Sequence, residues 1–265
     1  MSQISPLAYI DPEAKIGKDC EIGAFCYIDK NVEIGDNNVL MNSVTVLSGA
    51  RIGCGNIFFP GAVISAIPQD LKFKGEETTA IIGDNNKIRE NVTITRAPAA
   101  KGRTIIGSGN LLMESSHVAH DVTIGSGCII GNSTKIAGEV TIDDFANISA
   151  AVLMHQFCHV GGYVMIGGGT RFSQDIPPYV LVARRTGRLS RHKHSWFAQA
   201  RLLERNNREH PQCLPHTLPE RPVERGKPGA DKKGTAHDKG NCVHHQFYRN
   251  RKTRDNKIST QYTLA

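Results

Sequence analysis

The chain lacks the apolar segments that membrane proteins and secreted precursors carry. No run of apolar residues approaches the roughly 18 to 20 that a transmembrane helix needs. Met1–Ser5 opens the chain without the basic start and apolar stretch of a signal peptide. With 39% hydrophobic and 22% charged residues, the composition is that of a globular protein rather than a collagenous or wholly disordered one. We therefore expect a cytosolic protein with no membrane span.

Paired cysteine motifs are also missing. The seven cysteines are an odd number, and no two of them form a C-x-x-C pair. This excludes the cysteine framework of a small secreted domain and gives no indication of a zinc site. We expect reduced thiols.

Charge is divided unevenly along the chain, although the net charge is +7. Residues 185–265 hold 18 Lys or Arg and 7 Asp or Glu, a net charge of +11, whereas residues 1–184 hold 14 and 18, a net charge of −4. Because the two parts carry net charges of opposite sign, we expect a domain boundary near Arg184.

What the sequence does contain is a repeat with a period of six. A bulky apolar residue recurs at every sixth position from Ile10 to Phe172, 25 times in one register, with breaks over residues 65–81 and 97–103. Neither the 3.6-residue period of a helix nor the two-residue period of an amphipathic strand fits this spacing. Glycine often follows the apolar residue, and a small residue often lies two positions before it.

This pattern resembles the repeat of the hexapeptide-repeat acyltransferases. The resemblance implies an all-β fold, a left-handed parallel β-helix in which three hexads make one triangular coil of about 18 residues. The apolar residues would stack inside the prism, and successive coils would pair by parallel ladders. We expect this domain to span residues 1–184, with loop insertions at the two breaks.

Two sets of residues share the small position of the hexad and are expected to face the interior. Cysteines there would act as compact apolar side chains. Asparagines there would stack in adjacent coils as a ladder of amides, as Asn38 and Asn56 would because they lie three hexads apart. The cysteines are Cys20, Cys26, Cys128 and Cys158, and the asparagines are Asn38, Asn56, Asn86 and Asn110.

Histidines cluster in the second half of the repeat region. They are His117, His120, His155 and His159, and no other histidine lies between residues 1 and 184. His117 and His120 flank the inward-pointing Val118, so both lie outside the core. A coil of about 18 residues places Gly138 beside His120, and Gln156 beside Gly138, at the roughly 4.8 Å spacing of neighbouring strands.

The combination of His120, Asp121 and Gly138 favours general-base catalysis. Asp121 would orient the imidazole and stabilise its protonated form. Gly138 would leave open space for a substrate carbonyl, and its N–H would meet a developing oxyanion. No Ser or Cys nucleophile shares the hexad of His120, so direct acyl transfer from a thioester to a hydroxyl is indicated. On the plainer interpretation, Gly138 is a turn glycine.

A metal site is the alternative use of the same histidines. Carbonic anhydrases built on this β-helix use three histidines shared across a subunit interface, and His117, His120 and His155 would supply them here. A metal-dependent lyase or hydratase therefore stays open at this point.

Several longer motifs are similar to a narrower family. They are Gln69–Phe73, Lys87–Ile94, Asn110–Asp121, Asn132–Gly138, Val140–Phe145, His155–Cys158 and Gln174–Tyr179. Together they resemble the acyl carrier protein-dependent UDP-N-acetylglucosamine O-acyltransferases, which open lipid A synthesis. The resemblance covers residues 1–184 and includes both loop insertions.

This resemblance implies roles for individual residues. His120 would be the general base with Asp121 beside it, and Gly138 would be the oxyanion donor. The residues implied to contact the sugar nucleotide or the acyl-phosphopantetheine arm are Asp70, Lys72, His117, His155 and Gln156. Gly168 matches the position where side-chain size limits acyl length, which implies a long hydroxyacyl chain. Glu139 departs from the pattern, since some relatives carry a histidine there.

The resemblance also implies partners and assembly. UDP-N-acetylglucosamine and acyl carrier protein would be the substrates, and the enzyme would be a homotrimer with each site between neighbouring prisms. No metal or redox cofactor is expected, because a thioester is already activated, and no nucleic acid is expected as a partner.

The related N-acyltransferase of the same pathway is an alternative, but it carries an additional N-terminal uridine-binding domain. We expect none here, because the hexads begin at Ile10.

The resemblance stops after Arg184. Family members continue into a helical region, whereas residues 185–265 show no sustained amphipathic period and are expected to form a basic tail of low order. Shifted by one base, codons for His192–Arg201 can read Ile-Asn-Ile-Val-Gly-Leu-Arg-Lys-Arg, which is the missing family segment. We therefore hypothesise an out-of-frame tail, which leaves open an inactive copy. A genuine basic arm that binds nucleic acid or anionic lipid is the alternative.

Overall fold

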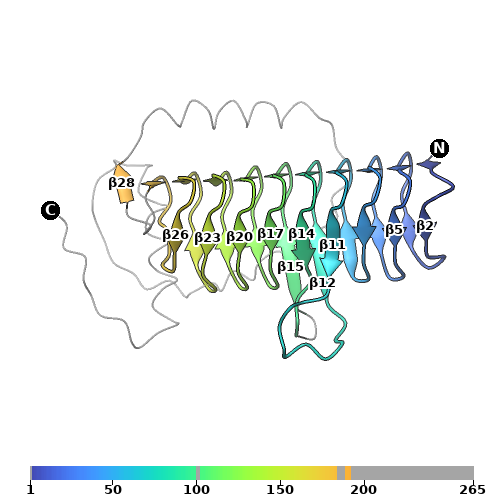
Figure 1. Cartoon of the computed structure of the whole chain (residues 1–265), viewed down its shortest axis with the longest axis horizontal. Coiled ribbons are helices and arrows are strands. Elements are labelled where there is room, and N and C mark those ends of the chain that lie inside the picture. Colours follow the sequence, from blue (N-terminus) through green and yellow to red (C-terminus); the bar gives the residue numbers. More distant parts are fainter. Residues whose placement is uncertain (1, 100–101, 184–188, 192–265) are drawn as a thin grey trace, which may run out of the picture. The chain divides into compact units, whose positions relative to one another are not determined.

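The computed structural model describes residues 2–99 and 102–183, together with the backbone of residues 189–191 (Figure 1). These residues form strands and turns assembled in three sheets, which are the faces of a left-handed β-helix. No helix in these ranges is long and apolar enough to cross a membrane. The predicted all-β fold of hexapeptide repeats is confirmed. The hypotheses about residues 185–265 lie outside the described residues, apart from that short backbone segment.

The strands of each sheet follow one another along the axis of the β-helix. Sheet A contains β1 (Gln3–Ile4), β4 (Glu21–Ile22), β7 (Val39–Leu40), β10 (Ile57–Phe58), β13 (Lys87–Ile88), β16 (Leu111–Leu112), β19 (Ile129–Ile130), β22 (Asn147–Ile148), β25 (Met165–Ile166), β27 (Leu181–Val182) and the antiparallel β28 (Leu189–Arg191). Sheet B contains β2 (Tyr9–Ile10), β5 (Tyr27–Ile28), β8 (Thr45–Val46), β11 (Val63–Ala66), β14 (Thr93–Thr95), β17 (His117–Val118), β20 (Lys135–Ile136), β23 (Leu153–Met154) and β26 (Arg171–Phe172). Sheet C contains β3 (Lys15–Ile16), β6 (Glu33–Ile34), β9 (Ala50–Ile52), β12 (Thr79–Ile82), β15 (Arg103–Ile106), β18 (Thr123–Ile124), β21 (Thr141–Ile142) and β24 (His159–Val160).

The repeat of six becomes a stack of coils in which every third hexad returns to the same sheet. In β17 and β20, for example, Val118 pairs with Ile136, and the chain visits sheets A, B and C in turn before returning to the same position. The apolar residue of each hexad faces the interior and is the last residue of its strand, except for Ile64 in β11 and Ile94 in β14. From Ile22 to Ile166 these side chains are at most 5% exposed. One continuous apolar core therefore stabilises the prism.

Two loops interrupt the regular coils where the hexad pattern breaks. The first spans residues 67–78 between β11 and β12, and the second spans residues 96–102 between β14 and β15. Val63 nevertheless pairs with Thr93, and Thr93 pairs with His117, in the same parallel ladder as the regular coils. The insertions therefore lengthen single coils, and the ladder continues past them with one local register shift between Ile64 and Ala66. Figure 1 shows the first loop projecting beside β12.

The small position of the hexad is occupied as predicted. Cys20, Cys26, Cys128 and Cys158 are all buried, with at most 3% of each residue exposed. Burial raises the pKa of the Cys128 thiol to about 12 and that of Cys158 to about 11. Both thiols therefore stay protonated at neutral pH and act as apolar filling.

The predicted asparagine ladder is present and begins at Asn38. The side-chain amide of Asn56 donates to Asn38 Oδ1 at 3.0 Å, and that of Asn86 donates to Asn56 Oδ1 at 3.0 Å. Asn110 ends the ladder differently, because its side-chain amide donates to the Gly125 carbonyl at 3.0 Å. These buried amides are satisfied by one another and by the backbone, as buried polar groups require.

The edge where the chain passes from sheet C to sheet A, the C–A edge, is tied together by side chains. The N–H of Lys18 donates to Asp36 Oδ1 at 2.7 Å, and the N–H of Ser126 donates to Asp144 Oδ1 at 2.7 Å. In each case the acceptor lies one coil later. The coils are so close here that a Cβ at Gly17 would lie 2.5 Å from Asp36 Oδ1, which explains the recurrent glycine.

Candidate active site

His120 and Asp121 lie in the turn between β17 and β18, at the edge where the chain passes from sheet B to sheet C. We call this the B–C edge. His120 Nδ1 lies 3.1 Å from Asp121 Oδ2, and the two side chains are 15% and 27% exposed. Asp121 adopts a left-handed backbone conformation, with φ of 57°. Its N–H donates to Thr104 Oγ1 at 3.0 Å, which fixes the turn that presents the pair.

Gly138 occupies the same turn position one coil later, between β20 and β21, and is buried. A Cβ at Gly138 would lie 2.5 Å from Cε1 and 2.6 Å from Nε2 of His120. The imidazole therefore lies against the glycine backbone. This differs from the open space that the sequence suggested, because the ring itself fills the volume that a side chain would take. Gly138 is needed for the position of His120.

The Gly138 N–H has no hydrogen-bond acceptor among the residues that the structure describes. At the C–A edge, the equivalent N–H groups of Lys18 and Ser126 are bound by a carboxylate one coil later. At the B–C edge the residue one coil after Gly138 is Gln156, and the Gly138 N–H donates to no group within residues 2–99 and 102–183. A free backbone donor therefore lies beside the imidazole.

His117 lies on the outer face of sheet B, three residues before His120. Its Nδ1 lies 2.6 Å from Thr93 Oγ1, and its backbone pairs with Thr93 and Lys135 on either side. Burial, and then the nearby charge of Lys135, lower the pKa of His117 below its ordinary value of 6.5. His117 is therefore neutral at neutral pH and serves as a hydrogen-bonding group.

His155 and Gln156 extend the B–C edge beyond Gly138. Both are exposed, and His155 Nδ1 lies 3.2 Å from the Gln156 carbonyl. The fourth histidine of the repeat region, His159, lies instead on β24 of sheet C and pairs with Asp143, with Nε2 and Oδ2 2.9 Å apart. Three of the four clustered histidines thus line sheet B or the B–C edge.

Asp70 and Lys72 lie in the loop of residues 67–78, which leaves the prism at the B–C edge. The Asp70 carboxylate accepts the Lys72 N–H at 2.9 Å, and its carbonyl accepts the Phe73 N–H at 3.0 Å. This turn directs the side chain of Leu71 into solvent, where the residue is 101% exposed. The loop therefore presents a carboxylate, an ammonium group and an uncovered leucine.

Gly168 does not share this edge. It lies in the turn between β25 and β26, where the chain passes from sheet A to sheet B, which we call the A–B edge. A Cβ there would lie 3.3 Å from the Ala150 carbonyl oxygen and would have little else around it. One chain therefore brings together His120, Asp121 and Gly138, but leaves Gly168 at a different edge.

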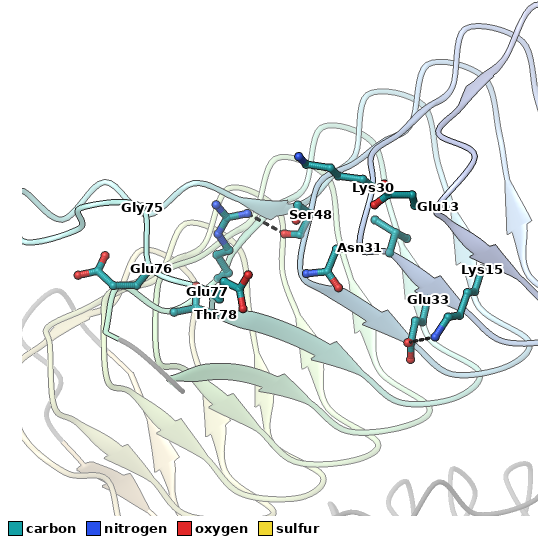
Figure 2. Close-up of a pocket in the computed structure, with 12 residues that line it drawn as sticks. Glu13, Lys15, Lys30, Asn31, Glu33, Ser48, Gly75, Glu76, Glu77 and Thr78 are labelled. Atoms are coloured by element: carbon teal, nitrogen blue, oxygen red, sulfur yellow. Dashed lines mark hydrogen bonds and ion pairs between the residues drawn. The ribbon is translucent and has the colours of Figure 1, made fainter.

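A polar groove of about 570 Å³ lies toward the N-terminal side of the first loop, and His120 is not among the residues that line it (Figure 2). Its lining residues are Glu13, Lys15, Lys30, Asn31, Val32, Glu33, Ser48, Gly75, Glu76, Glu77, Thr78 and Arg96. Lys15 and Glu33 form an ion pair at 3.0 Å on its wall. The sequence did not indicate this groove, because its walls come from two insertions without periodicity and from three successive coils.

Sequence analysis also missed Thr104, which holds the turn of Asp121. Its position two residues before Ile106 marks it as an inward-facing small residue, and it is fully buried. A polar residue at that position in the coil before His120 is the signal that would have identified it.

No group of three or more His, Cys, Asp or Glu in the described part of the chain is placed to hold a metal ion.

This chain is similar to one protein family and to several solved structures. Residues 103–138 match the family described as bacterial transferase hexapeptide (six repeats). LpxA, a UDP-N-acetylglucosamine acyltransferase from Bacteroides fragilis 9343, is 63% identical with a TM-score of 0.73, over 78% of this chain and 82% of that chain.

More distant solved structures agree with this match. The UDP-N-acetylglucosamine acyltransferase of Francisella novicida is 38% identical with a TM-score of 0.73, over 75% of this chain and 73% of that one. LpxA from Acinetobacter baumannii is 37% identical with a TM-score of 0.70, over 74% and 77%. All three solved structures are therefore at least 37% identical to this chain over at least 74% of its length.

Proposed function

The chain belongs to the UDP-N-acetylglucosamine acyltransferase family, and from this premise we propose that it transfers a 3-hydroxyacyl chain from acyl carrier protein to the 3-hydroxyl of UDP-N-acetylglucosamine, the first step of lipid A biosynthesis. The contact between His120 and Gly138 is the observation that carries this proposal. It joins a base to a free backbone donor, the two groups that acyl transfer to a hydroxyl requires.

The proposed reaction uses His120 as the general base. Nε2 takes the proton of the sugar hydroxyl while that oxygen attacks the thioester carbonyl, and the carbonyl π electrons move to oxygen. Asp121, whose Oδ2 lies 3.1 Å from Nδ1, stabilises the imidazolium that forms. Collapse of the tetrahedral species re-forms the carbonyl and breaks the C–S bond. The imidazolium then returns its proton to the departing thiolate, so His120 is regenerated.

Gly138 is proposed to stabilise the oxyanion through its N–H. A backbone donor costs no reorganisation as charge develops, which makes such groups efficient in acyl transfer. The absence of a side chain at Gly138 serves a second purpose, since a Cβ would collide with the His120 ring. The same residue thus supports both the base and the oxyanion.

The remaining predicted residues are proposed to bind substrate. Neutral His117, held by Thr93 at 2.6 Å, and the exposed His155 and Gln156 offer hydrogen-bonding groups along sheet B and the B–C edge. Lys72 offers a cation to the phosphates of the sugar nucleotide or of the phosphopantetheine arm. Asp70 shapes the turn that carries Lys72 through its 2.9 Å hydrogen bond. We propose no cofactor and no metal, because the thioester supplies the activated acyl group.

We further propose a homotrimer in which each site lies between neighbouring prisms. Gly168 and His120 lie at different edges of one prism, so a single acyl chain would meet both only in a cleft that combines two subunits. The exposed Leu71 in the loop beside the B–C edge would be covered by the neighbouring subunit. We place the enzyme in the cytoplasm, where both substrates are proposed to meet it.

The purified full chain tests this proposal. We expect it to convert UDP-N-acetylglucosamine and 3-hydroxyacyl carrier protein to the O-acylated sugar nucleotide, identified by mass spectrometry. Hydroxyacyl donors of graded length would show a preference for long chains, as the open surroundings of Gly168 suggest. Failure to form an ester with any donor length would contradict the proposal. Activity that depends on added zinc and is lost with a chelator would instead favour the metal alternative.

A further inference from the structure

Arg96 links the first insertion to the body of the β-helix. Its N–H donates to the Ala66 carbonyl at 3.0 Å, at the start of the loop of residues 67–78. Its Nη1 donates to the Ser48 carbonyl at 2.7 Å, the hydrogen bond drawn at Ser48 in Figure 2. Its guanidinium carbon lies 5.5 Å from the centre of the Phe73 ring. One side chain therefore touches both the loop and the preceding coil.

The base of the loop is fixed at the same carbonyl. Ser65 Oγ donates to the Ser48 carbonyl at 2.8 Å, so this oxygen accepts two hydrogen bonds. Ser65 adopts a left-handed φ of 62°, and the register between β11 and β14 shifts between Ile64 and Ala66. The backbone thus turns out of the coil where Arg96 and Ser65 converge.

The charge of Arg96 has no ion-pair partner among residues 2–99 and 102–183, and its Nε is buried there without a hydrogen bond. Burial lowers the pKa of Arg96 below its ordinary value. The charge of Asp29 partly opposes this shift, but the direct contacts of the guanidinium are with the Ser48 carbonyl and the Phe73 ring. The contact with Phe73 restrains the loop next to Lys72, because Phe73 directly follows Lys72 in the chain.

We propose that Arg96 is a positioning residue, which holds the loop of residues 67–78 so that Asp70 and Lys72 face the substrate at the B–C edge. This inference rests on the proposed function for the part that Asp70 and Lys72 play in binding. The mechanical part, that Arg96 orders the loop, stands on the contacts to Ser48 and Phe73.

Hydrogen exchange of the full chain tests the mechanical part. The Lys72 and Phe73 amides report on loop order, because both donate to Asp70. Arg96→Ala should speed their exchange about tenfold, and Phe73→Leu should do so without removing a charge. Arg89→Ala is the matched control, since Arg89 lies 4.4 Å from the centre of the Phe59 ring at the A–B edge. It should leave exchange in the loop unchanged.

Kinetics test the link to the substrate. Arg96→Ala should raise KM for the sugar nucleotide or for the acyl donor about tenfold while kcat changes less than about threefold, because the loop binds and does not react. Arg96→Lys should recover part of the loss, since an ammonium group still reaches the carbonyl and the ring.

Unchanged exchange at Lys72 and Phe73 in both Arg96→Ala and Phe73→Leu would overturn the inference. So would a loss of kcat with KM unchanged. An inactive wild-type chain would contradict the proposed function and leave the exchange experiment able to decide the role of Arg96. If Arg96→Ala fails to fold, Phe73→Leu gives the same exchange comparison.

Discussion

The imidazole of His120 lies against the backbone of Gly138, so closely that a Cβ at residue 138 would come within 2.5 Å of the ring. The two residues lie one coil apart and meet because each coil places the same turn position directly over the last one. A base and a backbone donor are thus held together by the stacking of the fold itself.

Gly138→Ala should displace the His120 ring and leave the fold intact. The added methyl group meets the end of a side chain that can rotate, so we expect kcat to fall by roughly two to three orders of magnitude with little change in thermal stability. Gly167→Ala adds the same group where the nearest heavy atom is 3.4 Å away. This control should keep most of its activity, and equal losses in both variants would contradict the role assigned to Gly138.

Asp121→Asn should slow the reaction because the imidazolium loses its charged partner. We expect kcat to fall by about one to two orders of magnitude, measured by ester formation at saturating substrate. The matched control is Asp143→Asn, which removes a carboxylate 2.9 Å from His159 on sheet C. A control variant as slow as Asp121→Asn would show that the effect is not specific to the pair at the B–C edge.

The pH dependence of stability should reflect His117. Its pKa is lowered in the folded state, so below about pH 6.5 the unfolded chain binds more protons than the folded one and stability falls as the pH falls. His117→Gln should therefore lose less stability than the wild type between about pH 7.5 and 5.5. Thermal unfolding across that range measures the difference, and identical curves would argue against a lowered pKa.

Substitutions in the asparagine ladder should lower the stability of the folded chain more than substitutions at exposed turns. Asn56→Leu would leave the Asn86 side-chain amide without its acceptor at 3.0 Å and remove the donor to Asn38. We expect a loss of about 2 kcal/mol or more in the free energy of unfolding, measured by denaturant titration. Asn132→Ala at an exposed turn should stay within about 0.5 kcal/mol of the wild type. A ladder variant as stable as this control would refute the structural role.

The out-of-frame hypothesis for residues 185–265 is tested by the coding DNA. Resequencing codons 175–200 should reveal one missing or added base, after which the shifted frame encodes the helical region of the family. An unchanged reading frame would contradict the hypothesis. Binding of the isolated tail to polyanions, with affinity that falls as salt rises, would then favour the basic arm.

The regular part of the fold was predictable because its physical rule is periodic. Each apolar residue of the repeat from Ile10 to Phe172 lies in a strand, and the coil of three hexads correctly placed Gly138 beside His120. The same rule gave the buried cysteines and the ladder from Asn38. Such positions follow from spacing alone, since every coil repeats the environment of the last.

The irregular parts were not predictable in the same way. The contact between Arg96 and Phe73 joins two insertions that carry no period, so no spacing relates the two residues. The sequence also predicted the role of Gly138 only in part. It indicated open space beside the glycine, but the imidazole of His120 fills that space, and spacing does not show how large a volume the ring takes. The role of Thr104 was not predicted, because the group that donates to it, the Asp121 N–H, lies in a different coil.

Acyl transfer at the B–C edge is tested most directly by comparing His120→Ala with the wild-type full chain. The measurement is the rate of ester formation from 3-hydroxyacyl carrier protein and UDP-N-acetylglucosamine. We predict a loss of roughly two to four orders of magnitude in kcat with thermal stability preserved, because His120 lies outside the core. Near-normal turnover by His120→Ala would contradict its assignment as the general base.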